Sequence, residues 1–183
     1  LCFESHSSSV VRISRTSFAG YDEDRVEADR GGAVSFQGGS HIIHNCRFEE
    51  WLRASVHGDA VYGAACASAE LANCLFVDAL GGGTVVRYEG GVTFEMVNCT
   101  LAHNTCSVDG VVSLPDLSEP SIHNCIIECG LDWGSPDCAS FPAVAFQGQL
   151  SDLPDNNCID GSGCSNIKSL FVHDDYSDYH TKR

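Results

Sequence analysis

A short motif of the form apolar-x-Asn-Cys-x-apolar recurs four times along this chain. The copies occupy 43–48, 71–76, 96–101 and 122–127. Their asparagines are 28, 25 and 26 residues apart, and a fixed period of roughly 20 to 50 residues is typical of solenoids. The sequence therefore predicts a chain wound into stacked coils, each about as long as one repeat.

Each copy of the motif also predicts which way its side chains point, because side chains alternate between the two faces of a strand. Apolar residues on both sides of the Asn-Cys pair face inward only if the asparagine sits at a corner. Asparagine tolerates the left-handed backbone conformation that such a corner needs, and its amide can bond the asparagine one coil away. We expect an internal ladder with inward-facing thiols, formed by Asn45, Asn73, Asn98 and Asn124 with Cys46, Cys74, Cys99 and Cys125.

A second apolar run, usually preceded by glycine, follows about halfway round each coil. These runs lie at 31–36, 58–62, 81–86, 110–114 and 142–146. Short β-branched runs bounded by Gly, Asn, Asp and Ser indicate strands and turns. No segment carries a helix-length apolar stripe, which excludes helical solenoids. Leucine-rich repeats have a similar period, but their LxxLxLxxN spacing is absent.

The predicted fold class is all-β, a right-handed parallel β-helix of about five or six coils. A degenerate copy at 13–18 has Arg15 in place of the asparagine, and a further copy is expected at 157–159. We expect 1–183 to form a single β-helix domain, as a fragment of or a subunit in a larger assembly, with 150–183 as its C-terminal closing segment.

The chain resembles the right-handed parallel β-helix proteins of the pectate-lyase-like superfamily, in particular polymorphic outer-membrane-protein-like repeats. Gly31-Gly32-Ala33-Val34 and Asn45-Cys46-Arg47-Phe48 carry this resemblance, which covers roughly 10–148, and 164–172 resembles the closing segment of such proteins. The resemblance implies the fold and permits action on acidic polysaccharides. Fold alone does not imply function.

Composition constrains the partners and the cellular location of the protein. Ten Lys and Arg against 25 Asp and Glu give a formal net charge of −15, which would repel nucleic acid. Eleven cysteines favour an oxidising compartment, so we expect an extracellular or cell-surface location. No run approaches the roughly 20 apolar residues that a membrane span requires, so no transmembrane segment is expected.

The cysteines outside the repeat lie in expected loops, where disulfides would staple turns. Cys129 with Cys138 and Cys158 with Cys164 are the candidate pairs, although sequence alone does not fix the connectivity. For the repeat cysteines, disulfides between neighbouring coils and a reduced stack both remain open, and a largely reduced stack is favoured. Asn98-Cys99-Thr100 satisfies the pattern of a glycan acceptor, but a place in an internal ladder argues against modification.

No residue cluster in the sequence demands a particular reaction. The acidic groups at 22–24 and 174–178 are far apart, basic residues are scattered, and His57 is the only partial echo of a hydrolase motif, so we predict no catalytic residue, metal or cofactor. The leading hypothesis is a non-catalytic structural or adhesive module with protein partners in an extracellular assembly, such as a surface appendage, filament or adhesin. The alternative is a carbohydrate-binding or polysaccharide-degrading protein whose candidate glycan-contact aromatics are Trp51, Tyr62, Tyr88 and Trp133.

Overall fold

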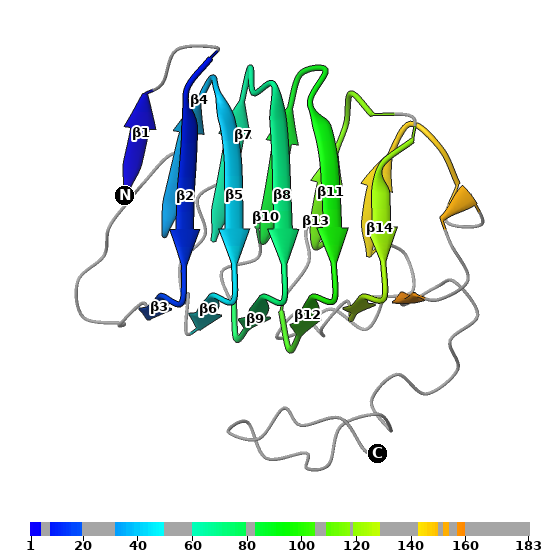
Figure 1. The fold of residues 1–183 in the computed structure, drawn as a ribbon. Coiled ribbons are helices and arrows are strands. Elements are labelled where there is room, and N and C mark those ends of the chain that lie inside the picture. The colour runs from blue at the N-terminus through cyan, green and yellow to red at the C-terminus, as the bar shows by residue number, and fades with distance from the viewer. Residues whose placement is uncertain are drawn as a thin grey trace.

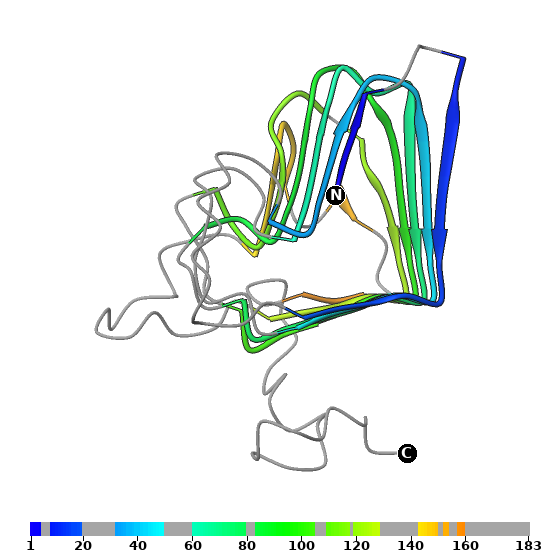
Figure 2. The ribbon, with the colours of Figure 1, turned by 90° about the vertical axis from the view of Figure 1, so that its left-hand side faces the viewer.

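The chain forms a parallel β-helix built from three sheets. The computed structural model describes residues 1–4, 8–19, 32–49, 60–79, 83–104, 109–117, 119–128, 143–149, 152–153 and 157–159. The coils stack side by side in Figure 1, and a view along the stack shows the sheets as three sides around the core (Figure 2). The all-β, parallel β-helix fold predicted from the repeat is confirmed.

Every pairing between named strands is parallel, and each coil adds its strands in the same order. Sheet A consists of β1 (Cys2–Glu4), β4 (Val34–Gln37), β7 (Val61–Ala64), β10 (Val86–Glu89), β13 (Val112–Leu114) and β16 (Val144–Phe146). Sheet B consists of β2 (Val10–Ser14), β5 (Ser40–His44), β8 (Ser68–Ala72), β11 (Thr93–Val97) and β14 (Ser121–His123). Sheet C consists of β3 (Ser17–Ala19), β6 (Arg47–Glu49), β9 (Leu75–Val77), β12 (Thr100–Ala102), β15 (Ile126–Ile127) and β17 (Cys158–Ile159).

The connections between the sheets differ sharply in how much their length varies. Five coils have a strand in both sheet B and sheet C, and in each of them two residues separate these strands. By contrast, 8 to 16 residues separate a sheet C strand from the next sheet A strand. The two-residue connection is the Asn-Cys pair itself in four coils. The uneven spacing of the repeat is therefore absorbed outside this corner, and the strands stay in register.

The corner between sheets B and C is made by a residue in the left-handed conformation. Asn45, Asn73, Asn98 and Asn124 have φ between 53° and 55°, and Arg15 has φ 53° in the degenerate copy. The backbone N–H of the corner residue bonds to the next coil, as from Asn45 N to Ala72 O (2.9 Å) and from Asn73 N to Val97 O (3.0 Å). Asparagine adopts this conformation at lower cost than other non-glycine residues.

Residues in register form columns inside the stack. In sheet C the rings of Phe18, Phe48 and Phe76 stack with centroids 4.8 and 4.6 Å apart and planes within 7° of parallel. Leu101 and Ile127 continue this column in the following coils. Phe48 and Phe76 are fully buried, and burial of each ring contributes roughly 1.5 to 3 kcal/mol in favour of folding.

One buried cluster in the core contains polar atoms. His41 is 1% exposed and its ring stacks on Phe36 with centroids 3.8 Å apart. Tyr88 leans into the space above Gly63, where an added Cβ would lie 2.2 Å from Tyr88 Cε1. His41 Nε2 lies 2.8 Å from the Gly38 carbonyl oxygen, which can only accept, so this nitrogen carries the proton. Among the buried side-chain nitrogen and oxygen atoms of the described residues, only His41 Nδ1 and Tyr88 Oη lack a hydrogen-bond partner.

The buried imidazole predicts a loss of stability in mild acid. Burial lowers the pKa of His41 below its ordinary value of 6.5, against a smaller opposing effect of the bond to Gly38. The unfolded chain therefore binds the proton more readily, and the free energy of unfolding should fall as pH drops below about 6.5. Urea unfolding at neutral and mildly acidic pH measures this. A His41→Phe variant, which keeps the stack on Phe36, should show a smaller decrease, and an unchanged pH dependence would contradict the assignment.

The corner between sheets A and B makes a second stability prediction. Gly38 and Gly90 have φ 78° and 87° there, but the equivalent residue of the third coil is Ala65, with φ 52°. An alanine in this conformation is strained by roughly 1 to 2 kcal/mol. Ala65→Gly should therefore raise the free energy of unfolding, by about 1 kcal/mol after the entropic cost of glycine. The matched control Ala64→Gly, within β7, should lower it, and equal effects of the two changes would be evidence against strain at Ala65.

Candidate functional site

The row of asparagines lies on the outside of the stack. All four side chains are exposed, because the left-handed corner turns them away from the core. Asn98 Nδ2 donates to Asn73 Oδ1 at 3.3 Å, which links two neighbouring coils. The expectation of an internal ladder was wrong in its placement. The asparagines are needed for the backbone of the corner, and their amides face solvent.

The cysteine after each of these asparagines points into the core. Cys46, Cys74, Cys99 and Cys125 are buried free thiols. Each donates to a backbone carbonyl of the preceding coil, as from Cys74 to Ile43 O (3.4 Å) and from Cys99 to Leu71 O (3.5 Å). The pKa of Cys99 is raised by hydrogen bonds with Cys125 and Cys74 and by burial, so its thiol stays protonated. A buried protonated thiol is a poor nucleophile and metal ligand. We refer to the four stacked cysteines as the thiol column, which packs inside the core.

The last expected copy of the repeat has a different register. Cys158 pairs with Ile126, so Asn157 is level with the thiol of Cys125 and not with an asparagine of the outer row. Asn157 Oδ1 accepts from Cys125 N at 2.9 Å, and its Nδ2 donates to Ile122 O at 2.6 Å. Residues 157–159 are therefore not a further copy of the motif. Asn157 takes the place of a thiol and bonds the carbonyl that a cysteine would have reached.

The candidate disulfide cysteines fall mostly outside the described residues. Cys129, Cys138 and Cys164 all lie there. Cys158, in β17, is disulfide-bonded. The other cysteines that the structure describes are free thiols. The pairing of Cys158 with Cys164 stays a prediction.

The candidate glycan-contact aromatics do not form an exposed line. Tyr62 is 1% exposed and Tyr88 is fully buried, so neither is placed to contact a glycan. Tyr88 belongs to the core, whereas Tyr62 lies on the outer face of sheet A, where its hydroxyl donates to Glu89 Oε2 at 2.7 Å. Trp51 and Trp133 lie outside the described residues. The sequence offered no sign that the outer face of sheet A is covered at this residue.

A polar network surrounds Tyr62 on the outer face of sheet A. Arg87 Nε lies 2.8 Å from Glu89 Oε1, and its Nη1 lies 2.8 Å from Asp109 Oδ2. The Arg87 side chain is only 12% exposed, so its two carboxylate partners compensate the charge that is removed from water. Both carboxylates bind the same guanidinium, and this links neighbouring coils on the outer face. Such an arrangement favours a structural role over proton transfer.

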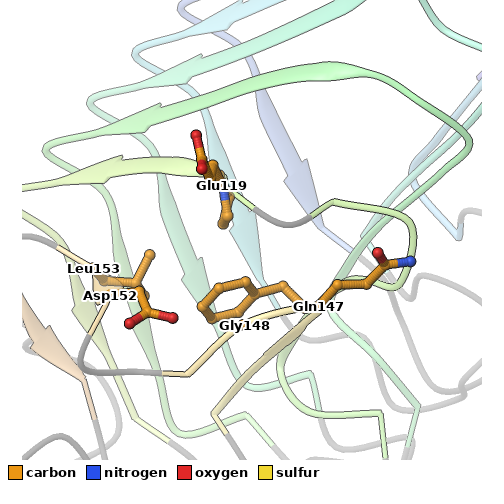
Figure 3. Close-up of a pocket in the computed structure, with 7 residues that line it drawn as sticks. Glu119, Gln147, Gly148, Asp152 and Leu153 are labelled. Carbon is orange, nitrogen blue, oxygen red and sulfur yellow. The ribbon is translucent and has the colours of Figure 1, made fainter.

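A cavity of about 390 Å³ lies at the C-terminal end of the stack. Figure 3 shows Glu119 on one side of it and Asp152 and Leu153 on another. Its apolar lining comes from Pro120, Phe146 and Leu153, and its polar lining from Glu119, Gln147 and Asp152. We refer to it as the end pocket.

The walls of the end pocket are held by backbone contacts. Asp152 Oδ2 accepts from Gln149 N at 2.8 Å, and Gln147 Nε2 donates to Pro115 O at 2.9 Å. An added Cβ on Gly148 would lie 2.3 Å from Phe146 Cε2, so only glycine lets this ring lie there. No sequence motif indicates this pocket, because its lining comes from 119–120, 146–148 and 152–153, which have no motif in common.

Two further observations apply to the part of the chain that the structure describes. Within it, no group of three or more His, Cys, Asp or Glu side chains is arranged to hold a metal ion. No helix among the described residues is long and apolar enough to cross a membrane.

Comparisons with known proteins do not assign this chain to a family. No protein family model, no curated protein and no solved structure matches this chain. The parallel β-helix is therefore assigned from the structure alone.

Proposed function

We propose that this chain is a non-catalytic extracellular or cell-surface module that serves as a rod segment in an appendage, filament or adhesin. Eleven cysteines, a disulfide at Cys158 and a net charge of −15 support an oxidising, extracellular setting. The likeness of the Gly-Gly-Ala-Val and Asn-Cys-x-Phe runs to polymorphic outer-membrane-protein-like repeats of the pectate-lyase-like superfamily supports the same reading.

The observation that carries this proposal is the opposite charge of the described exposed residues at the two ends of sheet B. At one end, Arg12 and Arg15 are exposed in and beside the outermost strand of sheet B. At the other end, Glu119 and Asp152 are exposed beside β14, the last strand of that sheet. Outermost strands also offer backbone groups for pairing with another chain. Complementary ends favour head-to-tail association and oppose head-to-head contacts.

Head-to-tail association is tested by reversing one end charge. Sedimentation velocity over a range of micromolar concentrations, at low and high salt, should show association that weakens as salt rises. Glu119→Lys should lower the association constant roughly fivefold, the upper range for one exposed ion pair. Glu95→Lys is the matched control, because it makes the same change of net charge on an exposed residue of β11, a strand that is paired on both sides. A monomer under all conditions, or equal effects of both variants, would refute the proposed assembly.

The end pocket favours a second candidate function, the binding of a sugar. A partly buried aromatic ring next to carboxylate and amide groups suits a polar ring of low charge. Glu119 and Asp152 would repel a uronate, so a neutral sugar fits this pocket better than an acidic one.

Sugar binding is tested by titrating neutral and acidic oligosaccharides while following chemical shifts of the protein. We expect saturable shifts for a neutral sugar at residues of the end pocket, and a loss of affinity of tenfold or more in Phe146→Ala, because the apolar contact is removed. Phe3→Ala is the matched control, since Phe3 is also a partly buried phenylalanine of sheet A, at the opposite end. Absence of saturable binding, or equal losses in both variants, would eliminate this candidate.

A further inference from the structure

One of the four equivalent corners differs from the others in its chemistry. Asn98 is followed by Cys99 and Thr100, which completes the acceptor pattern Asn-x-Thr for an N-linked glycan. The other three corners have Arg47, Leu75 and Ile126 at the third position. Local conformation does not distinguish the four asparagines, because all have φ between 53° and 55° and all are exposed.

The structure removes the objection to modification at this corner. The objection depended on an internal position for the asparagine, whereas the Asn98 side chain is exposed at the bend between β11 and β12. Thr100, the first residue of β12, is in register with Leu75 and Ile126 and is half-buried. Cys99 between them is 1% exposed and points into the core. Asn98 and Thr100 therefore lie on the same, outer side of the chain.

We propose that Asn98 carries an N-linked glycan, an inference that rests on the extracellular placement in the proposed function. The co-reactant is an oligosaccharide linked through a diphosphate to a lipid, which a transferase of the secretory pathway presents. Asn98 Nδ2 forms a bond to the anomeric carbon of the first sugar. The bond between that carbon and the diphosphate oxygen breaks, the lipid diphosphate leaves with the electron pair, and the amide loses one proton.

The outer row of asparagines can accommodate this modification. Asn98 Nδ2 donates a hydrogen to Asn73 Oδ1 at 3.3 Å. A glycosylated amide keeps one N–H, so this bond between coils can persist. The backbone N–H of Asn98, which donates to His123 O at 3.0 Å, takes no part in the reaction. Figure 1 shows the β11–β12 bend at the lower edge of the stack, beside the equivalent bend of the preceding coil. A glycan there would project from this edge.

The test is to produce the full chain behind a cleavable secretion signal in eukaryotic cells. Intact mass is then measured before and after digestion with a peptide-N-glycosidase. We expect one glycan per chain, with conversion of residue 98 to aspartate after the digestion. Thr100→Val, which keeps the β-branched shape and removes the hydroxyl, should abolish the glycan, and Thr100→Ser should retain it.

A matched gain of function uses the neighbouring corner. Ile126→Thr creates the same acceptor pattern at Asn124, which has the same φ and is also exposed, and it should add a second glycan. A secreted wild-type chain without a glycan at Asn98 would overturn the proposal, whether or not Ile126→Thr is modified. So would a glycan that persists in Thr100→Val. Glycan occupancy is measured by mass, and head-to-tail association is measured by sedimentation. Failure of the glycan proposal and failure of the proposed function are therefore recognised separately.

Discussion

The whole structure depends on the bend of the chain at the corner between sheets B and C. Two residues make this corner, the first in the left-handed conformation and the second facing inward. The first residue's backbone N–H bonds to the next coil, and in four coils the second residue's thiol bonds to the preceding one. Asparagine and cysteine meet these two requirements together, which is why the pair recurs. Once the corner is fixed, the strands on either side can only stack in register.

This local requirement explains why the fold could be predicted from the sequence. A left-handed corner selects a narrow set of residues, so asparagine at a regular spacing reveals the coil even where the flanking strands diverge. Arg15 and Ala65 occupy such corners without the usual residue types, and only the structure identifies the second of them. The prediction that the asparagine amides point inward was wrong, because strand alternation applies to the strands and says little about the bend between them.

The candidate sites were harder to predict, because they depend on what covers a surface. Alternation puts Tyr62 on the outer face of sheet A, yet its exposure is 1% and its hydroxyl is bonded to Glu89. The register of Asn157 depends on the insertion after β15, whose length does not fix where pairing resumes. The end pocket joins residues of the last two coils. Each of these facts concerns contacts between distant segments, which local patterns in a single sequence do not reveal.

The contrast between the invariant two-residue corner and the connections of 8 to 16 residues from sheet C to sheet A has a consequence for how such a chain can change. In the four coils with the Asn-Cys corner, connections of different length on that side leave the asparagine row and the thiol column in register. Loop closure also becomes only slightly less favourable as a loop lengthens. The molecule thus combines a corner of constant geometry with connections of variable length, where surface can be added or removed one coil at a time without rebuilding the stack.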